Sequence, residues 1–220
     1  MSISEGEIRE LVQRVLAQCG GMDLPGASCP GGRGFLIEAS ARHVHLTTQA
    51  VEALFGPGAR LTKKRDLSQP GEFLSEQRVK LVTPKGEIAN VAVLGPERGA
   101  VQVELSLTDA RGLGVAAPVN LSGDLTGAGD VYLVGDHGMI AAPGSVIAAK
   151  AHIHMTPADA ARLGVKDGDL VRVRARTSRP VTFDQVVVRV KGSFALAMHI
   201  DFDEANGCGL GRGDMGEIVP

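Results

Sequence analysis

The sequence is poor in cysteine and in large aromatic residues. Among its 220 residues, three are cysteine, one is tyrosine and none is tryptophan. Cys19, Cys29 and Cys208 lie far apart and form no C-x-x-C pair, so neither a disulfide framework nor a cysteine-based zinc knuckle is indicated. A reducing cytosol is therefore the expected setting.

Long apolar runs and a strong net charge are also missing. No apolar stretch approaches the roughly 18 residues of a membrane span. Glu5, Glu7 and Glu10 stand where a secretory signal would carry positive charge. The formal net charge of −2 provides no field that would gather nucleic acid or an anionic membrane. We expect a protein that is neither exported nor inserted, and that holds any anionic ligand locally.

Several common catalytic signatures are absent. No serine lies in a G-x-S-x-G elbow, so a covalent acyl-enzyme is not suggested. The segment 122–129 is glycine-rich but lacks the lysine of a P-loop, and we interpret it as a connection between strands. Cys208, in a glycine-rich loop, is more simply explained by packing than by nucleophilic chemistry.

The N-terminal segment, residues 1–19, predicts an amphipathic helix. Apolar residues recur at intervals of three and four, and Gly20-Gly21 offers a stop. Residues 20–34 are rich in glycine and proline, which predicts a flexible linker. A short helix on a linker cannot bury its own apolar stripe, so it needs a partner surface, of which its own domain is the simplest.

From Phe35 onward the pattern is mostly that of strands. Alternating or β-branched runs cover residues 78–82, 88–94, 101–107, 170–174 and 186–190, and turn signals at 83–86 and 135–138 predict hairpins. We predict a mainly β protein with a few short helices and two β-barrel domains, residues 35–140 and 141–220.

An internal repeat is the most informative feature. SARHVHLTTQAVEALFG, from Ser40, matches AKAHIHMTPADAARLGV, from Ala149. In each copy a strand runs into a helix, capped by Thr47 or Thr48 in the first and by Thr156 in the second. A second match aligns ELSLTDARGLGV with HIDFDEANGCGL and places Glu104 over His199. The two barrels are therefore predicted to be related by duplication.

The repeat carries two His-x-His pairs, His43 with His45 and His152 with His154. Residues two apart on a strand point to the same face, so each pair can reach one ion. A single pair is more simply read as hydrogen-bonded strand histidines, whereas two pairs at matching places favour metal binding. Adding Glu104 to the first and His199 to the second gives three-ligand sets typical of catalytic zinc, although cobalt and nickel also suit them.

Two further residues, His137 and Arg98, are candidates for a role near these ligand sets. His137 lies in a glycine turn and is expected on the surface. Arg98, in the turn Gly95-Pro96-Glu97-Arg98-Gly99, could hold an oxyanion near the metals through its planar guanidinium, although a solvated loop arginine is the simpler interpretation from sequence alone.

Together, the motifs SARHVHL, LSQPGEF, the GPxR turn, VELSLTDA, SGDL, HIHM and HIDFDEAN resemble the PduL-type phosphate propanoyltransferase family. The resemblance covers nearly all of residues 35–210. It implies a bacterial phosphotransacylase that converts propanoyl-CoA, or acetyl-CoA, and phosphate to acyl phosphate and CoA. It also implies two Zn²⁺ per chain, held by His43, His45, Glu104 and by His152, His154, His199.

The resemblance assigns further roles. Arg98 is similar to the family's phosphate-positioning arginine, and we expect it to act beside the second ligand set. Ser40 and Asn206 fall in motifs that would flank bound CoA. Family members commonly function inside bacterial microcompartments of the cytoplasm, and the N-terminal helix is similar to their encapsulation peptide, which would bind shell or core proteins. Exposed barrel faces would allow a homodimer.

Two other functions remain open from the residues. One is a di-metal hydrolase or thioesterase, in which water replaces phosphate. The other is a non-catalytic zinc-binding module recruited to an assembly by its N-terminal helix. Phosphate-dependent release of CoA would separate the transferase from the hydrolase, and metal binding without turnover would favour the module.

Overall fold

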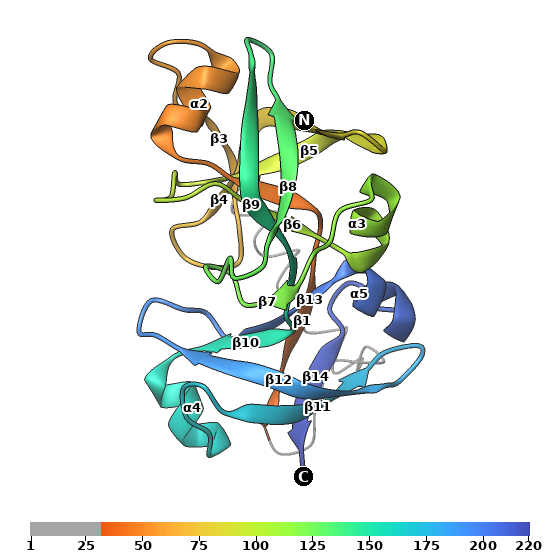
Figure 1. Ribbon diagram of the computed structural model, residues 1–220. Helices are drawn as coiled ribbons and strands as arrows, with labels where there is room; N and C mark the ends of the chain where they lie inside the picture. Colours follow the sequence, from red (N-terminus) through yellow and green to blue (C-terminus); the bar gives the residue numbers. More distant parts are fainter. Residues whose placement is uncertain (1–31) are drawn as a thin grey trace, which may run out of the picture.

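The computed structural model describes residues 32–220 (Figure 1). The predicted N-terminal helix lies outside the described residues. The strands are β1 (Gly34–Ser40), β2 (His43–His45), β3 (Lys63–Asp66), β4 (Phe73–Thr83), β5 (Gly86–Gly95), β6 (Gln102–Leu105), β7 (Val119–Asn120), β8 (Gly129–Val134), β9 (Met139–Ala149), β10 (His152–Met155), β11 (Leu170–Arg176), β12 (Thr182–Val190), β13 (Ala197–Asp201) and β14 (Met215–Val219). The helices are α2 (Thr48–Phe55), α3 (Leu107–Leu113), α4 (Pro157–Leu163) and α5 (Phe202–Cys208).

The strands form two closed barrels, which confirms the predicted fold class. In the first, β4, β5, β2, β6, β9 and β8 pair in a ring that closes between β8 and β4, and β3 and β7 extend it. In the second, the ring runs β1, β13, β10, β12, β11 and β14. Figure 1 shows the two barrels one above the other, with the short helices at their edges.

The first strand of each repeat lies in the barrel of the other repeat. β1 precedes the first His-x-His strand but pairs with β13 and β14, whereas β9 precedes the second but pairs with β6 and β8. The chain therefore crosses between barrels at residues 41–42 and again at 150–151. The expected division between residues 140 and 141 falls near the start of β9 and stays a prediction.

Strand register preserves the duplication. His43 lies opposite Glu104 on antiparallel β6, and His152 lies opposite His199 on antiparallel β13. Each His-x-His strand also has a parallel neighbour, β5 in the first barrel and β12 in the second. Equivalent residues of the two copies therefore occupy equivalent places in the two sheets.

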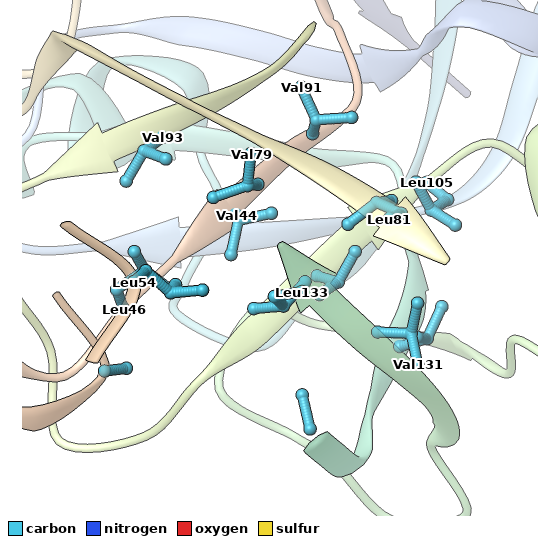
Figure 2. Packing of buried hydrophobic residues seen from close by; sticks show 14 of the residues in the cluster. Val44, Leu46, Leu54, Val79, Leu81, Val91, Val93, Leu105, Val131 and Leu133 are labelled. Carbon is cyan, nitrogen blue, oxygen red and sulfur yellow. The ribbon is translucent and has the colours of Figure 1, made fainter. Parts of the chain in front are cut away.

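Each barrel has its own apolar core. Figure 2 shows the first, where Val44, Leu81 and Leu133 reach the same interior from three different strands. The second core is built around Ile153, Met198 and Val188. The predicted alternation in the strands places these side chains inside, because successive residues of a strand face opposite sides of a sheet.

The helices begin at short polar caps that follow the strands. The Thr47 hydroxyl accepts a hydrogen bond from the Ala50 N–H, which selects Thr47 over Thr48 as the cap, and Thr156 forms a capping box with Asp159. The strand predicted over 101–107 was too long. β6 ends at Leu105, because the Ser106 hydroxyl accepts from the Asp109 N–H and starts α3 at Leu107.

Two smaller expectations concern the surface. His137 is exposed in the turn between β8 and β9, as predicted. Among the described residues, no helix is both long enough and apolar enough to cross a membrane.

Candidate active site

The first ligand set is assembled and buried. His43 and His45 project from β2, and Glu104 projects from β6 directly opposite His43. One ligand atom from each residue lies within 4.8 Å of the others, and His43 Nε2 is 3.5 Å from Glu104 Oε2. The structure thus brings together three side chains that are up to 61 positions apart in the sequence (104 − 43 = 61).

The second set occupies the equivalent place in the second barrel. His152 and His154 project from β10, and His199 lies opposite His152 on β13. The ring centroids are separated by 4.7 Å between His152 and His154, 4.9 Å between His154 and His199, and 5.3 Å between His152 and His199. Three imidazoles therefore cluster where the first barrel has two imidazoles and a carboxylate.

One ring in each set is oriented by the backbone of the crossover segment. His43 Nδ1 lies 2.8 Å from the Ala41 carbonyl oxygen, and His152 Nδ1 lies 2.8 Å from the Lys150 carbonyl oxygen. A carbonyl oxygen only accepts, so Nδ1 must carry the hydrogen in both rings. This leaves Nε2 with its lone pair, the arrangement typical of metal-binding histidines.

Other ring nitrogens are buried without a partner. Within the described part of the chain, His45 Nδ1 and both nitrogens of His154 have no hydrogen-bond partner. Buried polar groups are rarely left unsatisfied, because each costs free energy. A divalent cation would supply the missing partner, and imidazole with carboxylate is a donor set that suits zinc. The residues present therefore fit the predicted metal.

Burial sets the protonation states of the imidazoles. It lowers the pKa of His45 and of His154 to about 2 and that of His199 to about 3, so these rings are neutral near pH 7 and able to bind a cation. Burial also lowers the pKa of His152.

His43 and Glu104 behave differently because they face each other. Burial alone would lower the pKa of His43, but the Glu104 charge outweighs it and raises that pKa. Burial alone would raise the pKa of Glu104, but the attraction of His43 holds it well below its usual range. Glu104 therefore keeps its charge beside His43, and a cation bound there would face a carboxylate and an imidazole.

Both ligand sets line one cavity of about 840 Å³. Its walls come from both barrels, because the six candidate ligands share it. Six cationic side chains also line it: Arg42, Arg65, Arg78, Arg98, Arg189 and Lys191. Three glutamates, Glu38, Glu72 and Glu104, line it as well, so cationic side chains outnumber acidic ones in the lining. The cavity is suited to an anionic ligand.

Arg98 lies on the side of the first ligand set. Its Nη2 donates to Glu72 at 2.9 Å and its Nη1 donates to the Ser122 hydroxyl at 3.1 Å. Gln102 donates to both the Ser122 hydroxyl and Glu104, at 2.9 Å and 2.6 Å. The expectation placed Arg98 beside the second set, whereas this network connects it to the first.

Gln69 is a site residue that sequence reasoning did not identify. Its side chain is buried and reaches from the β3–β4 connection to the second barrel. The amide donates to the Ala195 carbonyl at 3.0 Å and accepts from the Ala195 N–H at 3.2 Å, and Nε2 lies 3.3 Å from His199 Nε2. The LSQPGEF motif contains this glutamine, but its partner is 126 positions away.

The remaining expected residues are divided between the cavity and its surroundings. Ser40, at the end of β1, lines the cavity. Asn206 is exposed on α5 and is not among the lining residues. Cys208 is fully buried in the second core, in keeping with a packing role.

Comparison with known proteins agrees with this arrangement. A family model described as phosphate propanoyltransferase matches residues 36–211, which span both barrels and all six candidate ligands. The chain belongs to the phosphate propanoyltransferase family. It is 55% identical over 191 residues to a phosphate propanoyltransferase of Leptotrichia buccalis, covering 84% of this chain and 87% of the relative.

Two further phosphate propanoyltransferases show how far the similarity extends. The one from Enterococcus faecalis is 50% identical over 185 residues, covering 84% of this chain and 88% of the relative. The one from Alkaliphilus metalliredigens is 41% identical over 222 aligned positions, covering 99% of this chain and the whole relative. Similarity to this family member therefore includes the N-terminal segment.

Proposed function

We propose that this protein is a phosphate propanoyltransferase, which transfers the acyl group of propanoyl-CoA, or of acetyl-CoA, directly to phosphate and releases CoA. The observation that carries the proposal is a single cationic cavity lined by two equivalent three-ligand sets. A reaction between two anionic substrates needs a place that both can reach, and family membership makes acyl-CoA and phosphate the expected pair.

Two zinc ions per chain fit the ligand sets, one held by His43, His45 and Glu104 and the other by His152, His154 and His199. When bound, such ions supply Lewis-acid stabilisation of a developing oxyanion and of a leaving thiolate. The neutral rings of His45, His154 and His199 are already in the protonation state that this binding requires.

Arg98 is the proposed phosphate-binding residue. Glu72 and Ser122 hold its guanidinium in place, and its planar fork can donate two parallel hydrogen bonds to an oxyanion. Because Glu72 already neutralises part of its charge, phosphate would have to compete with this ion pair or share the guanidinium with it. Arg98 would thereby orient phosphate beside the first ligand set.

The other proposals concern CoA and cellular context. Ser40 lines the cavity and is proposed to contact CoA, and Asn206 is proposed to contact it from α5 at the edge of the second barrel. The N-terminal segment is proposed to recruit the protein to shell or core proteins of a bacterial microcompartment in the cytoplasm. We also propose that the protein forms a homodimer and that it binds neither nucleic acid nor a membrane.

The deciding measurement is thiol release from propanoyl-CoA, with and without phosphate, on protein whose metal content is determined in the same preparation. We expect release to require phosphate and about two ions per chain to accompany activity. Thiol release without phosphate would identify a thioesterase instead. Metal binding without release would leave a non-catalytic module.

The role of Arg98 has its own test. Replacing Arg98 by Ala should raise the KM for phosphate by about tenfold or more, because a charge-assisted hydrogen bond contributes about 1.5–3 kcal/mol, and it should change the KM for propanoyl-CoA much less. Arg60→Ala is the matched control, since Arg60 also pairs with a glutamate, at 2.8 Å, but lies outside the cavity. Equal effects on both KM values would contradict the assignment.

A further inference from the structure

A second cationic group lies beside the three-histidine set. Arg189 is next to His154 in the parallel register of β12 and β10, and Lys191 follows two residues later. Both side chains line the cavity. The charge of Arg189 acts on the second set, since it contributes to lowering the pKa of His152, His154 and His199, whereas Arg98 acts on His43 and His45. The cavity thus has two cationic poles.

The duplication shows that this group is specific to the second repeat. In the first barrel, the position paired with His45 on β5 is Leu94. In the second barrel, the position paired with His154 on β12 is Arg189. The backbone environments are equivalent, so the barrel itself does not require an arginine there. The charge at position 189 therefore needs an explanation from the cavity.

Phe194 fixes the two cations near the second ligand set. Its ring is tilted against the His154 ring with a centroid separation of 4.1 Å. The guanidinium carbon of Arg189 lies 6.0 Å from the Phe194 centroid, and Lys191 Nζ lies 5.9 Å from it. Both distances are within the range of cation–π attraction. One aromatic ring thus holds an arginine and a lysine toward the same part of the cavity.

Within the described part of the chain, neither of these two charges is neutralised by a carboxylate. Arg98 pairs with Glu72 at 2.9 Å and Arg42 pairs with Asp109 at 2.8 Å. Among residues 32–220, by contrast, no carboxylate forms an ion pair with Arg189 or with Lys191. Arg189 is also partly buried, which makes an unpaired guanidinium more costly than one in open solvent. An anionic ligand at this place would recover that cost.

We infer that Arg189 and Lys191, held by Phe194, form a second anion subsite that binds a phosphoryl group, separate from the subsite at Arg98. The inference deepens the proposed function and rests on it for the identity of the ligands. Two sources offer the same chemistry: the phosphates of CoA, and the free phosphate or acyl phosphate. The subsite would assign one anionic substrate to each end of the cavity.

The test is direct binding by titration calorimetry to full-length, metal-loaded protein, with inorganic phosphate, CoA and pantetheine as separate probes. The variants are Arg189→Leu, which installs the residue of the first repeat, and Lys191→Met, at an exposed position where the substitution leaves the barrel core unchanged. Arg174→Leu is the matched control, because Arg174 is an exposed strand arginine on β11 outside the cavity.

Weaker binding of CoA by about tenfold or more, with pantetheine and phosphate binding unchanged, would assign the subsite to the phosphates of CoA. Weaker binding of inorganic phosphate with CoA binding unchanged would assign it to the second substrate. Binding of every probe at the level of Arg174→Leu would overturn the inference. Because binding is measured without turnover, a protein that binds these anions but transfers no acyl group would refute the proposed function and leave the subsite standing.

Discussion

Replacing Gln69 by Leu should loosen the contact between the two barrels at the cavity. The substitution keeps much of the side-chain volume but removes the amide that bonds to both backbone groups of Ala195 and lies 3.3 Å from His199 Nε2. Gln69 is only 5% exposed, so water cannot easily replace the amide. The N–H and carbonyl of Ala195, which is partly buried, would be left without these partners.

The size of the effect follows from these contacts. A buried donor or acceptor that loses its partner costs about 1–3 kcal/mol. Two such groups belong to Ala195, while His199 borders the cavity and can turn to water. Because Ala195 is only partly buried, we expect the lower part of the range for two groups, a loss of about 2–4 kcal/mol in the free energy of unfolding. For a domain of this size, each kcal/mol lowers Tm by roughly 2–4 °C.

The assay combines urea unfolding with metal analysis of the purified variant. Gln77→Leu is the control, because Gln77 also makes three hydrogen bonds through its amide, but to Arg60 and Thr62 of its own barrel and close to solvent. Gln69→Leu should be the more destabilising of the two, and should lower metal content where Gln77→Leu does not, since His199 loses a neighbour that positions it. Equal stability losses and unchanged metal content in both variants would refute the reasoning.

Three other predictions address the site and the cores. His45→Ala and His154→Ala should each lower the metal content from about two ions per chain to about one, because each residue belongs to one ligand set. Elemental analysis measures this content. Burial raises the pKa of Glu204 to about 7, so the free energy of unfolding falls as the pH rises from about 4.5 to 7. Glu204→Gln should remove up to about 3 kcal/mol of this fall, measured by urea unfolding at pH 5 and at pH 8. Leu133→Ala should cost about 2–5 kcal/mol in the same assay, because Leu133 is fully buried in the first core.

The sequence predicted those parts of the fold that depend on local pattern or on duplication. The His-x-His strands, the hairpins at 83–86 and 135–138 and the cap at Thr156 are encoded by neighbouring residues, and the structure has them in place. The error at 101–107 has a local cause as well, since Ser106 and Asp109 form a cap that the β-branched run obscured. The repeat supplied Glu104 and His199, because matching positions of a duplication share a register.

Contacts between distant segments could not be predicted in this way. Gln69 meets Ala195 across 126 positions, and Arg98 meets Ser122, which lies 24 positions away in the connection between β7 and β8. Strand exchange was also hidden, because β1 has the same local pattern in either barrel. Such features depend on which strand edges pair, and hydrophobic alternation does not specify that choice.

The exchanged strands explain why the two ligand sets share one cavity. The chain leaves β1 in the second barrel and reaches β2 in the first after only residues 41–42, and it makes the reverse crossing at residues 150–151. Both His-x-His strands must therefore begin where the barrels meet. The same crossings orient the rings, since the Ala41 and Lys150 carbonyls accept from His43 and His152. Duplication thus places two equivalent sets face to face, and the substitutions Glu104 for His199 and Leu94 for Arg189 at matching positions make them chemically different.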